Sequence, residues 1–480
     1  MIWRRLFGYF PASLAGGLAS FGAVYALTRL LSPADYGFYA LALTTMGIVY
    51  TLAVTWGEAA AYRFAGEAVA KGAMPDHIRT VLALLAASAA VAIVVMLGAV
   101  TIASDPKLKL ALAVAGATMI LAPVVNSAQE ISRAQQRVSR WSTVRICQDV
   151  GAFALGTFLA WRTGLGPAAP FAGLASVLAV LAVVESARLW RESRGGRFQR
   201  NRVRPYLAYG APVAIALVLN IALDAGDRFL IAYFLGPESV GVYAAGYGVA
   251  DKSVGLLCAW AAAAGAPMMM AAWEREGPEA VREVSRQVAR TLLLVAAPAA
   301  AGLALVARPL SEVMIGEEMR VQAAAIMPWI ALSGLMSGFV MHYLSEAFAL
   351  ARRTDLRAWL MAIPALANVA MNAVLLPWIG LMGAVYATVA CYALALVLLG
   401  VVGRRLAPLA WPWGDFAKVA GACAAMAVVV MLMPAIGGFP ELAMKAALGA
   451  ATYVMSALLL DAAGARGALQ GFAARKLRRA

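Results

Sequence analysis

Long apolar stretches alternate with short polar segments along the whole chain. Each stretch is about as long as a helix needs to be to cross a ~30 Å hydrocarbon core. The pattern therefore predicts an all-α polytopic membrane protein with about 14 transmembrane helices. We expect these helices at residues 10–31, 36–57, 80–103, 108–128, 144–162, 167–187, 207–235, 239–261, 289–308, 322–345, 358–377, 381–403, 415–434 and 441–461.

Composition excludes a water-soluble globular protein. Hydrophobic residues make up 63% of the chain, charged residues 14%, and the mean hydropathy is +0.77. Such a chain has too few polar groups to cover a soluble surface. The four cysteines lie far apart and there are only two histidines, so we expect no metal site, no disulfide framework and no cofactor.

Positive charge is concentrated between apolar stretches, most densely at residues 188–204. This segment holds seven arginines, with Glu192 as its single acid. Basic loops stay on the cytoplasmic side of a membrane. With both termini cytoplasmic, 31 of the 40 lysines and arginines fall on the inner side and eight at the outer side. The pattern predicts a multi-pass protein of the cytoplasmic (inner) membrane. It explains the net charge of +15 by topology and contact with anionic lipids, without nucleic acid.

Two internal registers indicate a duplication. Residues 30–40 align with residues 234–244, sharing Pro, Gly, Tyr and Ala at the same positions, and each stretch follows the first helix of a set of six. Farther along, Glu130, Arg137 and Gly164 align with residues 216 positions later, namely Glu346, Arg353 and Gly380. In the predicted outer turn, Pro fixes the start, Gly permits close backbone approach and Tyr anchors at the lipid headgroups.

The duplication predicts four parts. Residues 1–187 form an N-terminal six-helix lobe, residues 188–206 an Arg-rich cytoplasmic linker and residues 207–403 a C-terminal six-helix lobe. Residues 404–480 hold two accessory helices and a basic cytoplasmic tail. Because six is even, both lobes cross the membrane in the same direction, as parallel repeats around a central cavity.

The segment Leu-Ser-Pro-Ala-Asp-Tyr-Gly-Phe-Tyr at residues 31–39, together with the six-plus-six-plus-two arrangement, resembles the Wzx-type polysaccharide-biosynthesis flippases. These belong to the multidrug/oligosaccharidyl-lipid/polysaccharide (MOP) exporter superfamily. The resemblance implies a transporter, not an enzyme. Such a protein flips undecaprenyl-diphosphate-linked oligosaccharide from the inner to the outer leaflet by alternating access. A coupling ion, proton or sodium, and a polymerase and glycosyltransferases would be its partners.

Ionisable groups inside apolar stretches mark the candidate site, because an unpaired charge there costs ~2.5–3.5 kcal/mol. They lie near the predicted bilayer centre, in the second lobe only: the positions 204 residues earlier carry no ionisable side chain. The cluster fits either a transport site or a structural ion-pair network. As a site, its substrate-binding residues would be Lys252, Arg228 and Asn220, and its charge-balancing or ion-coupling residues Asp224, Asp227 and Asp251. Asp224 and Arg228 are four residues apart and can pair along one helical face.

Other charged residues suggest an entrance and local pairs. The segment from Trp273 to Arg290 predicts an interfacial helix, with Arg282, Arg286 and Arg290 on one face at the cytoplasmic entrance. This stripe either stays in water or guides a lipid phosphate. Glutamates near the inner ends, such as Glu58 and Glu185, are expected to reach water. Arg145 and Asp149, four residues apart, should pair.

Three functions are weighed. The first is the lipid-linked oligosaccharide flippase. The second is a cation-coupled multidrug exporter, or a lipid II flippase, of the same superfamily. The third is a membrane glycosyltransferase or ligase, which would need a large extramembrane loop with acidic or metal-binding residues. No predicted outer loop is long enough, so the third function ranks last.

Overall fold

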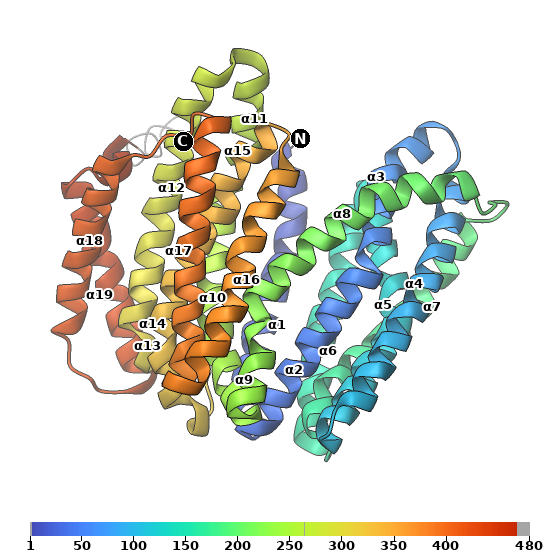
Figure 1. Cartoon of the computed structure of the whole chain (residues 1–480), viewed down its shortest axis with the longest axis horizontal. Helices are drawn as coiled ribbons and strands as arrows, with labels where there is room; N and C mark the ends of the chain where they lie inside the picture. The colour runs from blue at the N-terminus through green and yellow to red at the C-terminus, as the bar shows by residue number, and fades with distance from the viewer. Residues whose placement is uncertain (1, 264, 468–480) are drawn as a thin grey trace. The chain divides into compact units, whose positions relative to one another are not determined.

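A computed structural model describes residues 2–263 and 265–467, with side chains from residue 11 onward (Figure 1). Every regular element in these ranges is a helix. Helices suit a membrane because they satisfy all backbone hydrogen bonds within one segment. The chain divides into two compact units, Met1–Gly241 and Val242–Ala480, which are described separately below.

The first unit contains nine α-helices and one short 3₁₀ turn in its described residues. In Figure 1 they run from blue to green. Helices α5, α6 and α7 pack against one another, and α3 packs against α8. The elements are α1 (Ile2–Leu30), α2 (Pro33–Ala53), α3 (Thr55–Ala70), α4 (Met74–Ile102), α5 (Pro106–Ala134), α6 (Val138–Arg162), η1 (Gly166–Ala168), α7 (Ala169–Glu192), α8 (Arg200–Ala225) and α9 (Asp227–Leu235).

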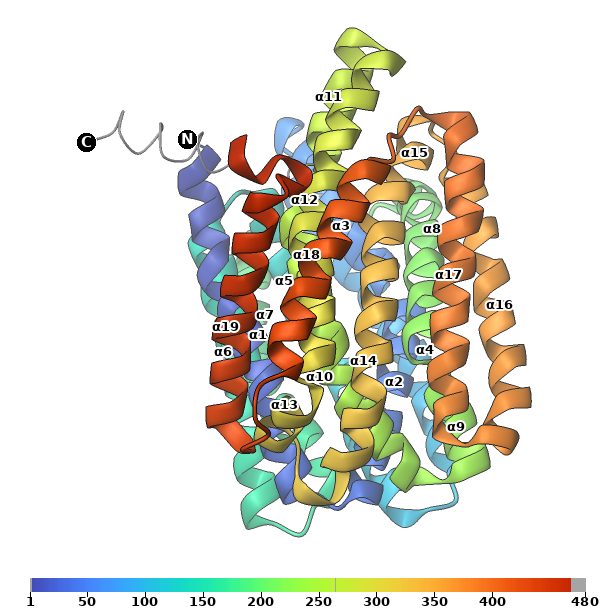
Figure 2. The same ribbon diagram turned by 90° about the vertical axis from the view of Figure 1, so that its left-hand side faces the viewer.

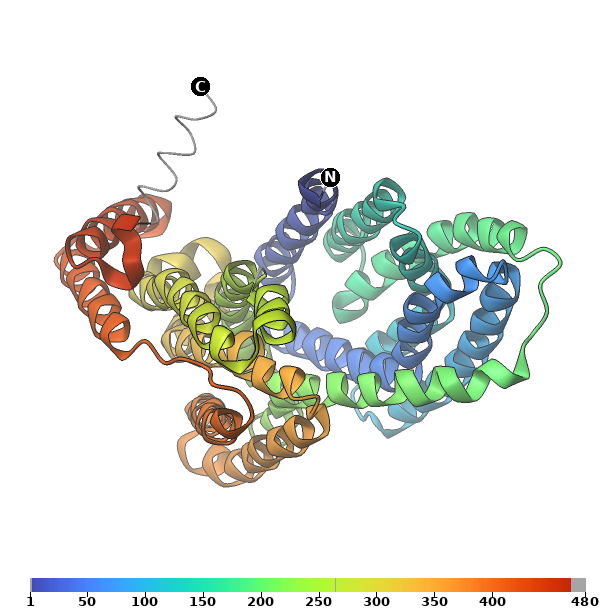
Figure 3. The same ribbon diagram turned by 90° about the horizontal axis from the view of Figure 1, so that it is seen from above.

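The second unit contains most of α10 and all later elements. Helices α16 and α17 pack together, and the last pair, α18 and α19, lies beside α12, as Figures 2 and 3 also show. The elements are α10 (Pro237–Ala262), α11 (Gly265–Glu276), α12 (Pro278–Leu305), α13 (Ala307–Met314), α14 (Glu317–Phe339), the π-helix η2 (Val340–Leu344), α15 (Ser345–Leu350), α16 (Thr354–Ile379), α17 (Leu381–Leu406), α18 (Trp413–Met431), α19 (Gly438–Leu459) and η3 (Ala462–Gly464).

The all-α membrane fold is confirmed. Twelve helical segments among the described residues are long and apolar enough to cross a membrane. The remaining two predicted spans, 10–31 and 144–162, fall on α1 and α6, which have 29 and 25 residues and are not among these twelve. Helix α6 carries the Arg145–Asp149 pair, which forms as predicted at 2.8 Å.

The repeated turn shows why both copies need glycine. A Cβ added to Gly37 would lie 1.9 Å from the carbonyl oxygen of Pro237, and one added to Gly241 would lie 2.0 Å from that of Pro33. The two turns therefore contact each other through their backbones, so the predicted close approach is confirmed. The expected headgroup anchor is wrong for the second tyrosine, because Tyr243 is fully buried, 3.5 Å from the hydroxyl of Thr388.

Three predicted segments are interrupted or shortened. The span 207–235 breaks at Gly226 into α8 and α9. The segment from Trp273 to Arg290 is not one interfacial helix, because Gly277, with φ +86°, separates α11 from α12. The basic segment 188–204 is mostly helical, since α7 ends at Glu192 and α8 begins at Arg200. Most of the predicted basic tail, 468–480, lies outside the described residues.

Candidate functional site

The predicted polar residues of the first unit lie on both sides of the Gly226 break. Asn220 and Asp224 are half-buried on α8, whereas Asp227 and Arg228 begin α9. A Cβ at Gly226 would approach the carbonyl oxygen of Ala222 to 2.3 Å, so this glycine permits the bend. The continuous helical face that the predicted Asp224–Arg228 pair assumed is therefore interrupted.

Arg228 is held against the second helix of the chain. Its Nη1 donates a hydrogen bond to Oγ1 of Thr44 on α2 at 3.0 Å, and Thr44 is buried. The neighbouring Asp227 is also buried, with 1% of its surface exposed. A cation and a carboxylate thus sit among apolar helices at the junction of α8 and α9, where a buried charge requires polar partners.

The other two residues of the predicted cluster lie on α10 in the second unit. Asp251 is half-buried and Lys252 is exposed. Val254 and Cys258, about one and two helical turns beyond Asp251, are fully buried. The two charged residues therefore lie at the edge of the buried face of α10, with Lys252 accessible at the surface of the unit.

The predicted arginine stripe lies at the start of α12, and its members differ. Arg290 Nε donates to Oδ2 of Asp415 on α18 at 2.7 Å, and Asp415 is buried. Its other oxygen accepts the backbone N–H of Ala463 at 3.1 Å. Arg290 therefore ties α12 to the accessory helices. Arg282 is exposed, and Arg286 pairs with Glu283 at 3.0 Å in the solvated first turns.

Sequence reasoning missed a polar group between α2, α3 and α5. The hydroxyl of Tyr50 donates to Oε1 of Glu58, and Nδ2 of Asn126 donates to the Tyr50 hydroxyl at 2.8 Å. Burial raises the pKa of Glu58 to about 7, although its hydrogen bonds oppose the shift. Glu58 can therefore exchange a proton near neutral pH. Its position next to an apolar span was the available signal.

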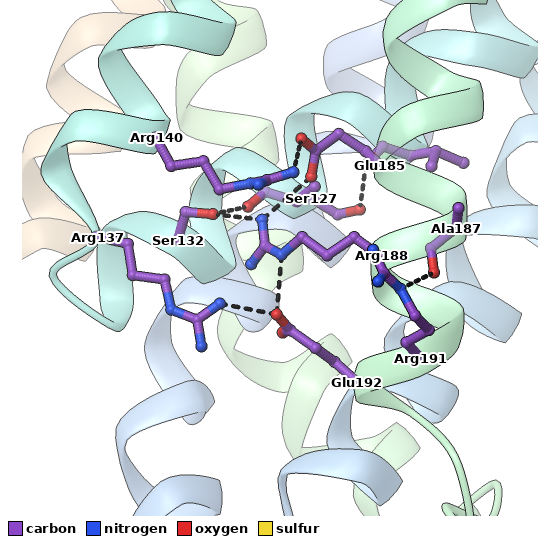
Figure 4. A network of polar contacts seen from close by, with 11 residues as sticks. Ser127, Ser132, Arg137, Arg140, Glu185, Ala187, Arg188, Arg191 and Glu192 are labelled. Carbon is purple, nitrogen blue, oxygen red and sulfur yellow. Dashed lines mark hydrogen bonds and ion pairs between the residues drawn. The ribbon is translucent and has the colours of Figure 1, made fainter.

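A second missed group joins the ends of α5, α6 and α7 (Figure 4). Arg140 Nη2 donates to Oε1 of Glu185 at 2.6 Å, and Arg188 donates to Glu185 at 3.1 Å and to Glu192 at 2.9 Å. Arg137 also donates to Glu192, at 2.7 Å. The expectation that Glu185 reaches water is wrong, because only 1% of its surface is exposed. We call these five residues the α5–α7 ion cluster.

The described side chains do not assemble a metal centre. Within residues 2–263 and 265–467, no group of three or more His, Cys, Asp or Glu side chains could hold a metal ion. The described polar groups are charged and protonatable side chains within the helices, including Glu58, Asp227 and Arg228.

Residues 26–323 match the model of the family described as polysaccharide biosynthesis protein. The chain belongs to this family. The match covers more than half of the chain and includes the turn at residues 31–39 and all of α8, α9 and α10. It confirms the resemblance to the polysaccharide branch of the superfamily. No curated protein matches the sequence.

Solved structures share the fold of this polysaccharide biosynthesis protein. An inward closed conformation of the lipid II flippase MurJ aligns with a TM-score of 0.71 at 12% identity, over 93% of this chain and 97% of that chain. An inward-facing MATE family multidrug resistance transporter of the MOP superfamily aligns at 0.63 and 15% identity, over 81% and 94%. A MOP superfamily transporter from Pyrococcus furiosus aligns at 0.55 and 13%, over 84% and 94%. The fold predicted for the MOP superfamily is confirmed.

Proposed function

We propose that this protein flips undecaprenyl-diphosphate-linked oligosaccharide from the inner to the outer leaflet of the cytoplasmic membrane. The flipped units would supply surface polysaccharide or exopolysaccharide synthesis. Transport would proceed by alternating access of two six-helix lobes, residues 1–187 and 207–403. A proton or sodium ion would serve as the coupling ion, and the polymerase and glycosyltransferases of the same process would be the partners.

One observation supports this proposal above all: a family match over residues 26–323 in a chain with the fold of lipid flippases and exporters. The family supplies the connection to polysaccharide synthesis, and the fold supplies the connection to transport. A flippase needs no catalytic group, and the polar residues of α8, α9 and α10 are suited to bind an anion reversibly.

In this proposal Lys252, Arg228 and Asn220 bind the substrate diphosphate, while Asp224, Asp227 and Asp251 balance the cations between cycles. The diphosphate would compete with the carboxylates for the cations, so substrate binding would loosen their pairing and favour a lobe movement. Arg282, Arg286 and Arg290 would attract the headgroup at the cytoplasmic entrance. Of these three, Arg290 is the least available, because Asp415 already binds it.

Deleting the gene tests the function itself. We expect surface polysaccharide to be lost and lipid-linked oligosaccharide to accumulate on the inner leaflet, with unchanged drug sensitivity. Increased drug sensitivity with normal polysaccharide would favour a cation-coupled multidrug exporter. Accumulation of peptidoglycan precursors and cell lysis would favour the alternative function of a lipid II flippase, whose fold this chain shares.

Replacing Lys252 tests the site. Lys252→Met keeps the length and removes the charge, so the variant should insert normally yet fail to restore polysaccharide, while Lys252→Arg should keep part of the activity. The exposed position of Lys252 makes misfolding of these variants an inadequate explanation for a loss. Full activity of Lys252→Met, or rescue when it is combined with Asp224→Asn, would place the site elsewhere.

A further inference from the structure

A cavity of about 820 Å³ lies along α6 and α7, outside the residues assigned to transport above. One wall is a stripe of α6 with the spacing of a single helical face: Arg140, Thr143, Val144 and Cys147. The opposite wall comes from α7, through Leu181, Val184 and Glu185. Arg137 and Ser139, at the beginning of α6, complete the lining that the argument uses.

The cavity is polar at one end and apolar at the other. Arg137, Ser139 and Arg140 lie at the start of α6, and Cys147 lies ten residues beyond Arg137, or ~15 Å along a helix. Toward that end the lining changes to Val144 and Leu181. The polar end belongs to the arginine-rich side of the chain, which the charge distribution predicts to be cytoplasmic. The cavity thus matches the profile of a lipid, with a headgroup at the interface and a chain deeper in the membrane.

The polar end has an excess of hydrogen-bond donors. The α5–α7 ion cluster contains three arginines and two glutamates, so one positive charge is not balanced within it. Nε of Arg140, which lines the cavity, is buried and has no hydrogen-bond partner among the described residues; the same holds for Nη2 of Arg188, which lies behind the lining. In addition, the side chain of the N-cap residue Arg137 makes no capping hydrogen bond to the first turn of α6, whose backbone N–H groups carry partial positive charge.

We propose that this cavity binds the phosphate headgroup of a lipid, with Arg137 and Arg140 on the phosphate and the hydrocarbon chain along Val144, Leu181 and Val184. Arginine suits the role because its planar fork of donors matches phosphate oxygens. Binding of a lipid phosphate here does not depend on the proposed transport function, whereas the polyprenyl diphosphate as its source rests on that function. Two sources carry the required chemistry, an anionic phospholipid of the surrounding leaflet and a polyprenyl diphosphate.

Cys147 provides a reporter inside the cavity. It lines the cavity and is exposed, whereas Cys258 and Cys391 are buried and do not compete for a thiol reagent. We would remove the half-buried Cys423 by Cys423→Ala and measure the rate of N-ethylmaleimide labelling of the full chain in nanodiscs. The discs would contain phosphatidylcholine alone, or with increasing phosphatidylglycerol, polyprenyl diphosphate or added inorganic phosphate.

We expect anionic lipid to slow the labelling of Cys147. Slowing by phosphatidylglycerol would identify an ambient phospholipid as the ligand. Slowing only by the polyprenyl diphosphate would identify a lipid of the substrate class. Inorganic phosphate, which lacks the chain, should protect Cys147 far less. Equal labelling rates in all discs would overturn the proposal.

Two variants separate headgroup binding from folding. Arg137→Gln should raise the lipid fraction needed for half-protection about tenfold, because a charge-assisted hydrogen bond to the phosphate is lost. The change should not disturb folding, because Glu192 still pairs with Arg188. Ser139→Glu adds a negative charge where a helix start tolerates it and should abolish protection. Arg145→Gln, on α6 but outside the lining, is the matched control and should behave like the wild type. Unchanged protection in both test variants would also overturn the proposal.

Discussion

The end of α5 and the end of α15 have the same backbone geometry, while the side chains around them differ. Gln136 has φ 58° and Arg352, 216 residues later, has φ 55°. The next N–H in each copy bonds a carbonyl five residues earlier, Arg137 to Ser132 and Arg353 to Phe348, both at 2.8 Å. This is the Schellman ending of a helix, here with a non-glycine residue in the left-handed conformation. The duplication has preserved the turn.

Stabilisation differs between these two regions. At the positions of Arg140 and Glu185 in the first copy, the second copy has Leu356 and Val401. Farther from the turn, thirteen residues before Arg352, the second copy has an aromatic cluster in which Phe339 and Trp411 stack at 6.2 Å. The hydroxyl of Tyr343 donates to the carbonyl of Ala410. The two copies therefore share a helix end of one geometry without sharing the buried ion cluster.

The largest effect should come from Glu185→Gln. Arg140 and Arg188 would lose their shared buried carboxylate, and breaking a buried ion pair costs about 3–5 kcal/mol. Thermal unfolding in detergent would measure the loss, with Val401→Ala in the second copy as the control of small effect. The double change Arg140→Leu and Glu185→Val, which installs the second copy's residues, should be less harmful than Glu185→Gln. Wild-type stability of Glu185→Gln would show that the ion cluster does not hold these helices.

The corresponding test of the second copy is Phe339→Ala. Phe339 is 3% exposed, and removing a buried ring typically costs about 3 kcal/mol through lost contacts and a cavity. The same unfolding measurement should show a smaller loss for Phe339→Leu. Equal stability of Phe339→Ala and the wild type would mean that the aromatic cluster does not stabilise the second copy.

A third difference between the copies is protonation. The position 204 residues after Glu58 is Ala262, so only the first copy carries this carboxyl. Burial raises the pKa of Glu58 to about 7 from an ordinary value of 4.5, so its stabilising contribution is complete below pH 4.5 and is lost as the pH rises through 7.

Glu58→Gln should therefore remove a decline in stability on the order of 2 kcal/mol between pH 5 and pH 8. Unfolding curves of the wild type and the variant across this range would measure it. Glu67→Gln is the matched control, because Glu67 is exposed on the same helix and pairs with Lys71. Parallel pH profiles for the wild type and Glu58→Gln would contradict the assignment.

The smallest effect should be the same in both copies. Gln136→Gly and Arg352→Gly each place glycine at a left-handed position, where it avoids the strain of a Cβ, and each should stabilise the protein by up to about 1 kcal/mol. Alanine at the same positions should bring no gain. If only one of the two glycine variants is more stable than the wild type, the two turns share their geometry but not their backbone strain.

Some of this architecture could be predicted from the sequence and some could not. The spans were predictable because their lengths match the membrane, and the duplicated turn was predictable because Gly37 and Gly241 keep their places. The break at Gly226 was missed, since glycine is common within membrane helices and the apolar run continues on both sides of residues 224–228. Lys252, Arg228 and the other residues of the proposed site remain predictions.

The sequence by itself determined the membrane class, the duplication and the positions of the repeated turns, because hydrophobic length and local backbone requirements are properties of short segments. Only the tertiary structure decided which charges are buried and paired. Arg140 and Glu185 are 45 residues apart, and Tyr50 and Asn126 are 76 apart. The periodicity of one helix reports its own faces, but not which side chain of another helix lies opposite them. For the same reason the raised pKa of Glu58 could not be predicted from the sequence, because it depends on the packing of α2 and α5 around this carboxyl group.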